Sequence, residues 1–296
     1  MKKEKIILVT GSAGMVGSYA QEVFSDYNLM ITDIVDGYLY LDVQDRSAVF
    51  ELIKSKKPDY VCHLAAATDV DRCELEPDWA FKVNAEGTRN IALACKESGI
   101  TMIYISTGAV FSGEKEIPYR ETDQVLPSNK YGVSKYEGEK IVQSLLDRFY
   151  IVRASWMIGG GRIDKKFVGK VVHKIMSGEK SVKVVNDKFG SITYAKDLLC
   201  GIRELIKTDK CGIYHMTNGG MCSRYDVAKE IVNIIGKAEV EIIPVSSDEF
   251  PLPAPRGYSE ALENYRLNLM GLNHMSPWKE ALKEYIREEL LPLCDR

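Results

Sequence analysis

Short apolar runs alternate with longer, helix-like stretches through the first half of the chain. The apolar runs predict strands at residues 5–10, 28–33, 59–64, 102–106 and 149–153. Helices are predicted at residues 77–98, a stretch that is followed by Gly99, and at residues 132–148. Strands and helices that alternate in this way form a parallel sheet covered on both faces. The pattern therefore predicts an α/β fold with a Rossmann-type, doubly wound parallel sheet.

The second half of the chain is less regular. Gly159, Gly160 and Gly161 predict a flexible turn before a helix near residues 167–176. Residues 247–259 are rich in proline and predict a loop. A loop of this kind either closes over a substrate or lies on the surface, and its composition favours neither alternative.

Composition and charge narrow the class of protein. The 296 residues are 45% hydrophobic and 27% charged, which is typical of a soluble globular protein with one large or two modest domains. A formal net charge of −3 gives no basic field for nucleic acid, and no apolar run approaches the roughly 20 residues of a membrane span. With no signal-type segment at the N-terminus, we expect a cytoplasmic protein that binds neither nucleic acid nor membrane.

Neither the cysteines nor the histidines have a spacing typical of a metal site. The seven cysteines include no C-x-x-C pair, and the four histidines form no cluster. His63 and His215 each follow strand-like residues, so we expect them to be hydrogen-bonded groups of the core rather than metal ligands. For the cysteines we expect free thiols.

A glycine-rich loop follows the first predicted strand. Residues 11–17 read Gly-Ser-Ala-Gly-Met-Val-Gly and precede a helix. Glycines at this spacing let the backbone turn tightly and approach a pyrophosphate, to which the helix N-terminus offers free N–H groups. An ordinary strand-to-helix turn is the alternative, but the order of strand, glycine loop and helix favours a dinucleotide site.

Asp33 ends the second predicted strand, about twenty residues after the first glycine of the loop. A carboxylate at this point can hold the hydroxyls of the adenosine ribose. The alternative is a solvated loop aspartate. The next residues are Ile34, Val35 and Asp36, with no Lys or Arg to meet a 2′-phosphate. The sequence therefore favours NADH slightly over NADPH.

Tyr131 and Lys135 form a Y-x-x-x-K sequence on the predicted helix 132–148 and its first flanking residue. Positions i and i+4 of a helix lie on one face, so the Lys135 ammonium is expected near the phenol, where it would lower the tyrosine pKa. A tyrosine with such a pKa can exchange a proton with a substrate oxygen. Thr107, at the end of the strand-like run from residue 102, can offer a hydroxyl to the same oxygen.

Four candidate residues fall at the ends of predicted strands. They are Gly11, Asp33, Ala65 and Thr107. Ligands of a doubly wound sheet bind at the carboxyl ends of its strands, so we expect these four segments to meet in one crevice.

Taken in order, these segments resemble a known family. The chain looks like an extended short-chain dehydrogenase/reductase, specifically of the dTDP-4-dehydrorhamnose reductase group, and the resemblance runs nearly end to end. The segments that carry it are residues 11–17, 63–71, 83–88, 105–107, 118–123, 131–135, 153–156 and 253–256.

The resemblance implies a domain division and a set of site residues. Residues 1–155 would form the dinucleotide-binding domain, to which a segment near residues 187–215 returns, and residues 156–296 mainly a smaller, discontinuous substrate-binding domain. The catalytic residues would be Thr107, Tyr131 and Lys135. The cofactor would be bound by Gly11, Gly14, Met15, Val16, Gly17, Asp33, Asp42, Val43, Leu64, Ala65, Ala66, Tyr131 and Lys135. The substrate would be bound by Thr68, Asp69, Val70, Thr107, Trp156 and Arg256.

The activity implied is the NAD- or NADP-dependent reduction of a 4-keto-6-deoxy nucleotide sugar, in dTDP-rhamnose and polysaccharide biosynthesis. The resemblance also allows a homodimer. A nucleotide-sugar 4-epimerase would use the same tyrosine and lysine and is the enzymatic alternative. A non-catalytic, nucleotide-binding regulatory subunit, like that of methionine adenosyltransferase, is the alternative outside catalysis.

The chain departs from the family pattern near the catalytic threonine. The reductases usually continue Asp-Tyr-Val-Phe-Asp-Gly, whereas this chain has Gly108, Ala109 and Ser112 at the three polar positions of that run. We expect a roomier sugar pocket there, suited to a bulkier substituent such as an acetamido group. Some members carry acidic metal ligands after the glycine loop, where this chain has Ser18 and Tyr19, so we expect no metal.

Overall fold

A seven-stranded parallel sheet forms the centre of the molecule in a computed structural model that describes residues 5–294. The strand order is β11-β6-β5-β4-β1-β2-β3, and every neighbouring pair is parallel. The strands are β1 (Ile6–Thr10), β2 (Asn28–Asp33), β3 (Leu39–Tyr40), β4 (Tyr60–His63), β5 (Thr101–Thr107), β6 (Phe149–Ala154) and β11 (Gly212–His215). The predicted doubly wound parallel sheet is confirmed.

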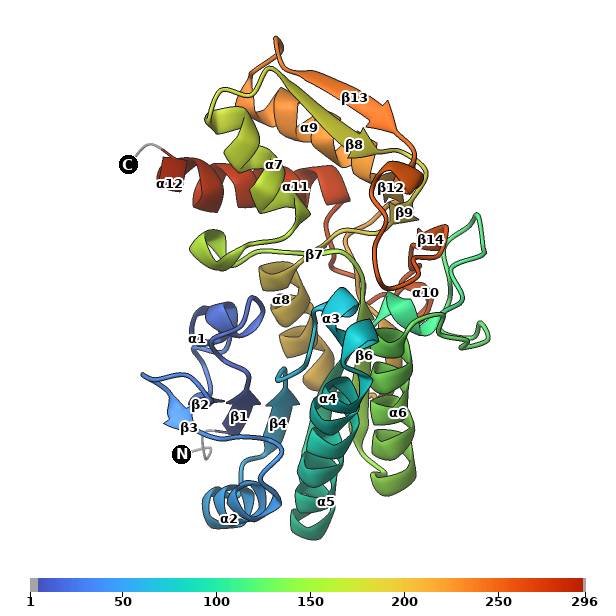
Figure 1. The fold of residues 1–296 in the computed structure, drawn as a ribbon. Coiled ribbons are helices and arrows are strands. Elements are labelled where there is room, and N and C mark those ends of the chain that lie inside the picture. The colour runs from blue at the N-terminus through green and yellow to red at the C-terminus, as the bar shows by residue number, and fades with distance from the viewer. Residues whose placement is uncertain (1–4, 295–296) are drawn as a thin grey trace.

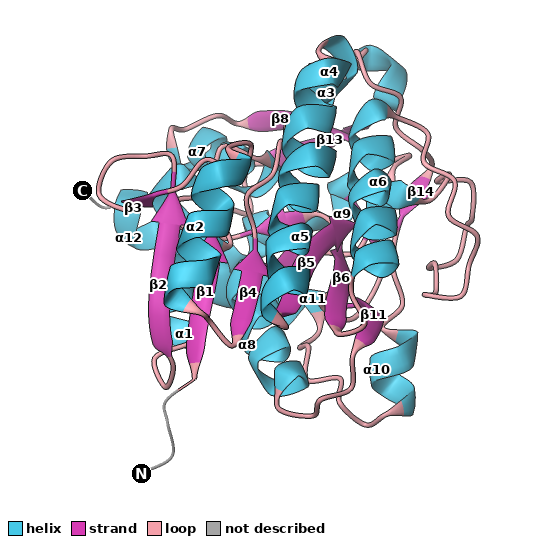
Figure 2. Ribbon diagram, turned by 90° about the horizontal axis from the view of Figure 1, so that it is seen from below, coloured by secondary structure: helices cyan, strands magenta, loops and turns pink. Residues whose placement is uncertain are grey.

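Helices cover both faces of this sheet, because its strands bury alternate side chains on opposite sides. Leu8 packs with α2 (Arg46–Lys56), α5 (Thr88–Ser98) and α6 (Lys130–Leu145), which lie in front of the sheet in Figure 2. Ile7 and Val9 pack on the other face with α1 (Ala20–Val23) and α8 (Ala195–Ile206).

The predicted helix 77–98 is three consecutive helical pieces. Proline begins α4 (Pro77–Phe81), a π-helical turn η2 (Lys82–Gly87) follows, and α5 ends at Gly99, whose φ of 66° closes the helix. Extra residues in a π turn often serve a site. Here the turn directs the buried Asn84 side chain to the backbone of Ala67, to which it donates and from which it accepts a hydrogen bond, at 3.0 and 2.8 Å.

A second group of elements lies above the carboxyl ends of the sheet strands (Figure 1). Its largest parts are α7 (Phe167–Met176), α9 (Arg224–Ile235), α11 (Trp278–Tyr285) and the parallel pair β8 (Ser181–Val185) and β13 (Glu241–Val245). Its smaller parts are α3 (Val70–Leu75), α12 (Leu291–Cys294), β7 (Met157–Ile158), β9 (Phe189–Gly190), β10 (Thr193–Tyr194), β12 (Cys222–Ser223), β14 (Ser259–Glu260) and the turns η4 (Gly161–Ile163), η5 (Ser247–Glu249) and η6 (Ile286–Leu290). The short helix α10 (Tyr265–Leu269) packs beside β11, and the turns η1 (Gly17–Tyr19) and η3 (Gly108–Val110) follow β1 and β5.

One hydrophobic core joins the upper elements to the sheet. Val168 of α7 and Leu282 of α11 belong to the same buried cluster as Val9. The chain also returns late to the sheet, where β11 pairs with β6. The division into domains at residue 155 stays a prediction. Within residues 5–294, no helix is both long and apolar enough to cross a membrane.

Both histidines that were expected in the core are there. His63 lies between Thr10 and Thr88, with its ring nitrogens 2.8 and 3.2 Å from their hydroxyls. Burial lowers the pKa of each ring to about 3, which keeps both neutral. The Nδ1 atom of His215 lies 3.1 Å from the carbonyl of Tyr119, so this ring too serves the packing of the core.

Candidate active site

A cleft of about 1520 Å³ lies between the carboxyl ends of the sheet strands and the upper elements. Every residue that the sequence assigned to catalysis, cofactor or substrate lines it. These residues are Gly11, Gly14, Met15, Val16, Gly17, Asp33, Asp42, Val43, Leu64, Ala65, Ala66, Thr68, Asp69, Val70, Thr107, Tyr131, Lys135, Trp156 and Arg256. We call the part around residues 11–17, 33–35, 41–44 and 64–66 the cofactor side, and the part around residues 156, 224, 256 and 260 the sugar side.

The glycine loop of the cofactor side requires glycine at its two ends. Gly11 has a φ of 71°, and a Cβ there would lie 2.6 Å from the backbone nitrogen of Ala65. A Cβ on Gly17 would lie 2.5 Å from the carbonyl oxygen of Gly11. At Gly14 a Cβ would approach only that oxygen, at 3.3 Å, so this backbone borders open space. The loop thus presents bare backbone to the cleft, which suits a pyrophosphate.

Asp33 lies beside the loop at the end of β2. Its carboxylate accepts hydrogen bonds from the backbone N–H groups of Ala13, at 2.9 Å, and Ile34, at 2.7 Å. These bonds fix the carboxylate and the glycine loop together. Ile34 and Val35 are exposed next to it, and the cationic residues of the cleft all come from other segments, namely Lys135 and residues 162–256. A carboxylate with no cation beside it in the same segment suits a ribose with free hydroxyls.

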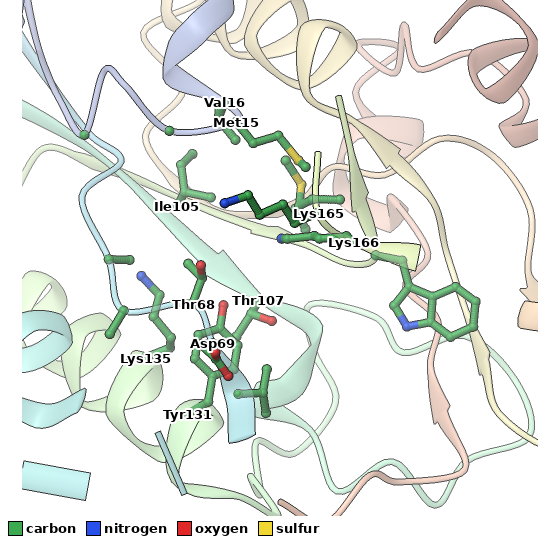
Figure 3. Close-up of a pocket in the computed structure, with 18 of the residues that line it drawn as sticks. Met15, Val16, Thr68, Asp69, Ile105, Thr107, Tyr131, Lys135, Lys165 and Lys166 are labelled. Atoms are coloured by element: carbon green, nitrogen blue, oxygen red, sulfur yellow. The ribbon is translucent and has the colours of Figure 1, made fainter. Parts of the chain in front are cut away.

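Tyr131 and Lys135 lie on the first turns of α6, and Thr107 ends β5 (Figure 3). The side chain of Asn129 caps the helix by accepting a hydrogen bond from Gly132 N–H, at 2.8 Å. Gly132 allows the close packing that follows, because a Cβ there would lie 2.1 Å from the carbonyl oxygen of Ala109. The helix start therefore presses against η3, the turn that directly follows Thr107.

The expected lowering of the Tyr131 pKa by Lys135 is wrong for this structure. Burial raises the pKa of Tyr131, and a hydrogen bond with Thr107 opposes that rise only in part. Burial also lowers the pKa of Lys135 to about 7, against the pull of Glu139. The Lys135 ammonium lies 4.1 Å from the centre of the Tyr104 ring. Sequence spacing alone does not reveal this buried surface of β5 beneath the lysine.

A buried network supports α6 from below. Glu139 and Arg153 form two hydrogen bonds, of 2.8 and 2.6 Å, with both side chains buried. The Ser106 hydroxyl donates a third hydrogen bond to Glu139, at 2.5 Å. Because these bonds join α6 to β5 and β6, they fix the helix of Tyr131 relative to the strand of Thr107.

The remaining residues predicted for the substrate lie across the cleft. Trp156 has a φ of 33°, a backbone conformation that non-glycine residues rarely adopt and that is often found at functional sites. Arg256 pairs with Asp71 at 3.0 Å and donates to the carbonyl of Ala254 at 2.9 Å. Asp69 caps α3 by accepting a hydrogen bond from the backbone of Arg72. Two of these side chains thus have structural partners as well as a place in the cleft.

Sequence reasoning missed several charged residues of the cleft. Lys165 and Lys166 extend into it opposite Thr107 and Tyr131 (Figure 3), and Arg224 and Glu260 line it near Trp156. The pair of lysines after the glycine turn was a local signal for an anion. Arg224 and Glu260 had no such signal, because each comes from an isolated short segment of the second half.

The expectation of a roomier sugar pocket at residues 108–112 is wrong. Gly108, Ala109 and Ser112 do not line the cleft. A Cβ on Gly108 would point at the carbonyl oxygen of Glu260, 3.0 Å away, and Ala109 is buried. Ser112 instead lies 3.2 Å from the hydroxyl of Tyr119. The short side chains allow close packing behind Thr107, and none of the three forms part of the cleft wall.

The segment after the glycine loop is tied to the C-terminal helices by hydrogen bonds. The Tyr19 hydroxyl donates to the Glu289 carboxylate at 2.7 Å and accepts from the backbone of Gly160 at 2.5 Å. The Tyr194 hydroxyl donates to the same carboxylate. Among residues 5–294, no group of three or more histidine, cysteine or acidic side chains is placed to hold a metal ion.

Comparison with known proteins places this fold and cleft in a family. The family model described as RmlD substrate binding domain matches residues 4–291. A dTDP-4-dehydrorhamnose reductase of Streptomyces griseus is 34% identical, over 94% of this chain and 91% of its own length.

Solved structures of dTDP-4-dehydrorhamnose reductases have the same fold as this chain. A dTDP-4-dehydrorhamnose reductase from Clostridium acetobutylicum superposes with a TM-score of 0.89 at 38% identity, over 96% of this chain and 99% of the other. One from Bacillus anthracis, in complex with NADP, gives a TM-score of 0.90 at 34% identity, over 97% of this chain and all of the other. The chain therefore belongs to the RmlD substrate-binding-domain family, as its resemblance to the dTDP-4-dehydrorhamnose reductases indicated.

Proposed function

We propose that this protein is an NAD(P)H-dependent reductase of a 4-keto-6-deoxy nucleotide sugar, with dTDP-4-dehydrorhamnose as its first candidate substrate. The observation that carries the proposal is the meeting of Thr107, Tyr131 and Lys135 with the glycine loop in one cleft. The reductases of Streptomyces griseus and Clostridium acetobutylicum, which resemble this chain nearly end to end, carry that substrate in their names.

The cofactor side suits a dinucleotide on structural grounds. The backbone at Gly14 borders open space, and Gly11 and Gly17 leave no room for a side chain beneath it. Asp33 would hold the adenosine ribose, with Asp42 and Val43 nearby. Leu64, Ala65 and Ala66 line the cleft directly beside Gly11. The related Bacillus anthracis enzyme binds NADP.

The choice between NADH and NADPH is part of the proposal. A carboxylate at the position of Asp33 repels a 2′-phosphate, and the exposed neighbours Ile34 and Val35 offer no charge to bind one. We therefore favour NADH. The comparison of kcat/KM for the two cofactors decides this point.

The chain's own part in the reaction is to hold the sugar oxygen and move one proton. A bound, reduced nicotinamide supplies the hydride to the keto carbon. The Tyr131 hydroxyl donates its proton to the oxygen on which charge develops, and the Thr107 hydroxyl donates a hydrogen bond to the same atom. The raised pKa of Tyr131 keeps the phenol protonated before the reaction, as a general acid requires.

Lys135 would bind the nicotinamide ribose and return Tyr131 to its protonated state through the ribose hydroxyls. A lysine whose pKa is about 7 can exchange a proton near neutral pH, as this relay needs. The position of Lys135, one turn after Tyr131 on α6, supports both roles.

The diphosphate of the substrate would lie against the cations of the segment after the glycine turn. Arg162, Lys165, Lys166 and Lys170 line the cleft and have no ion-pair partner among residues 5–294. Four unpaired cations on one wall attract a diphosphate and leave the sugar to reach Tyr131.

The test follows the loss of reduced nicotinamide absorbance when the protein is mixed with 4-keto nucleotide sugars. We expect turnover with dTDP-4-dehydrorhamnose, and a rate lower by about 10²–10⁴-fold when Tyr131 is replaced by Phe. No oxidation with any 4-keto sugar, under conditions where the cofactor binds, would overturn the proposal and favour a regulatory role.

A further inference from the structure

Two opposite charges face each other across the sugar side of the cleft without pairing. Arg224 is the first residue of α9, and Glu260 is the last residue of β14. Both line the cleft beside Trp156. Among residues 5–294 no ion pair of 4.0 Å or less joins them, although each lies near enough to affect the pKa of the other.

Arg224 is held by aromatic rings alone. Its guanidinium lies 3.7 Å from the centre of the Trp156 ring and 4.9 Å from that of Phe167. No hydrogen bond from its side chain to residues 5–294 is found. Stacking fixes the plane of the group while its five N–H donors stay available. Burial lowers the pKa of Arg224 to about 10, so the group still carries its charge at neutral pH.

Glu260 is the matching acceptor. Along β14 the side chain of Ser259 is buried and that of Glu260 points the opposite way, into the cleft. Burial raises the pKa of Glu260, against the opposing effect of Arg224, Arg256 and a hydrogen bond with Trp156. A carboxylate accepts about four hydrogen bonds, so most of its capacity is unused.

Arg256 shows what a paired charge looks like in the same cleft. Its guanidinium bonds to Asp71 and to a backbone carbonyl, which ties the loop before β14 to α3. Arg224 and Glu260 form no comparable ion pair that ties two described segments of the fold together. Placing two charged groups in a half-buried site with most of their hydrogen-bonding capacity unused costs stability, which points to a ligand that uses it.

The ligand group must accept from a guanidinium and donate to a carboxylate. A hydroxyl does both with one oxygen. An ammonium would be repelled by Arg224. An acetamido group would bring a methyl against two charges, and the Trp156 face that could pack with it is covered by Arg224. In a 4-keto-6-deoxy sugar, the hydroxyl next to the keto carbon is the one on C3. The backbone of Glu260 packs against Gly108, the residue after Thr107, where a Cβ would lie 3.0 Å from the Glu260 carbonyl oxygen, so Glu260 lies near the reacting end of the sugar.

We propose that Arg224 and Glu260 are the residues that select the sugar, by binding its C3 hydroxyl between the guanidinium and the carboxylate. This inference rests on the proposed function for the placement of the keto carbon at Tyr131. With this pair of residues the protein would select sugars that carry a hydroxyl on C3. It would bind 3-deoxy, 3-amino and 3-acetamido analogues less tightly.

Binding tests the proposal without turnover. The affinities of dTDP and of dTDP-rhamnose are measured by calorimetry, with oxidised cofactor present, and their ratio gives the contribution of the sugar. In Glu260→Gln and Arg224→Lys we expect this ratio to fall by about 10- to 100-fold, as for hydrogen bonds to charged groups, while dTDP binds as before. Glu241→Gln and Arg89→Lys, at exposed positions outside the cleft, are the matched controls and should leave the ratio unchanged.

A second measurement uses the unaltered protein. We expect kcat/KM to be at least 10-fold higher for the 3-hydroxy 4-keto substrate than for its 3-deoxy and 3-acetamido analogues, since a site built to bond a hydroxyl rejects analogues without it. Equal kcat/KM values, or an unchanged affinity ratio in both variants, would overturn the inference. A protein that oxidises no cofactor, but whose variants lose sugar affinity, would overturn the proposed function and leave this inference standing.

Discussion

The cofactor side and the sugar side of the cleft are built in different ways. The cofactor side uses backbone and short side chains at the ends of β1, β2 and β4, and the carboxylate of Asp33 there is held by two backbone N–H groups. The sugar side uses long charged side chains from α9, β14 and the loops around them, and Arg224 and Glu260 there have no ion-pair partner within the described residues 5–294. The Asp33 carboxylate has its hydrogen-bond partners before any ligand binds, whereas Arg224 and Glu260 keep hydrogen-bonding capacity that a ligand can use.

This difference explains what the sequence could predict. The glycine loop, Asp33 and Thr107 each lie within one strand-and-turn segment, so short motifs located them, and the parallel sheet brought them together. Trp156, Arg224 and Glu260 meet because β9 pairs with β14 and with β12, the strand before Arg224, and because Gly190 of β9 leaves room for the Trp156 ring. No spacing in the sequence encodes that meeting.

The two errors of the sequence reasoning have the same cause. The Y-x-x-x-K spacing correctly placed Lys135 one turn from Tyr131, but the pKa of each depends on burial against β5. The small residues at 108 and 109 follow Thr107 in the chain, yet η3 turns them away from the cleft and towards β14 and α6. The sequence correctly identified residues that lie close together because they are close in the chain. It did not identify residues from distant segments that the fold brings into contact.

The largest effect is expected at the boundary of the two sides. Tyr131→Phe should lower kcat by about 10²–10⁴-fold, because the general acid is lost. Cofactor affinity, measured by fluorescence titration, should stay nearly the same. Tyr136→Phe, on the same helix but outside the cleft, is the control. A kcat within a factor of two of the parent would rule out Tyr131 as the acid.

The buried network beneath α6 holds the boundary between the two sides, and one substitution removes its central ion pair. Arg153→Met should lower the free energy of unfolding by about 3–5 kcal/mol, because Glu139 is left as a buried, unpaired charge. Arg148→Met removes an exposed ion pair with Asp209 and should cost about 0–1 kcal/mol. Urea unfolding of both variants measures the difference. Equal losses would mean that the buried pair does not hold α6 in place.

Lys135 should lower the stability of the protein without ligands near neutral pH. Its pKa falls from 10.5 to about 7 on folding, so the unfolded chain binds the proton more tightly. The cost is full below pH 7 and disappears as the pH rises from 7 towards 10.5. Lys135→Met should therefore raise the melting temperature most at pH 6 to 7 and least above pH 10, while turnover falls. A variant that melts lower than the parent at every pH would contradict this.

The smallest effect concerns cofactor choice. The parent should prefer NADH, and Asp33→Asn should reduce that preference roughly 10-fold, equivalent to about 1.4 kcal/mol, because the charge that repels a 2′-phosphate is removed. The amide oxygen can still accept a bond from the glycine loop. The ratio of kcat/KM for NADH and NADPH measures the change. A parent that prefers NADPH, with a ratio unmoved by the substitution, would show that Asp33 does not face the ribose.

The central claim is that a hydride passes across this cleft to the keto carbon of the sugar, and isotope transfer tests it most directly. The protein is given dTDP-4-dehydrorhamnose and a reduced cofactor that carries deuterium at the transferred position, and the sugar product is examined by NMR. The account predicts one deuterium at C4 in a product reduced by one equivalent of cofactor. A reduced sugar without deuterium at C4, or no reduced sugar although the cofactor is bound, would contradict it.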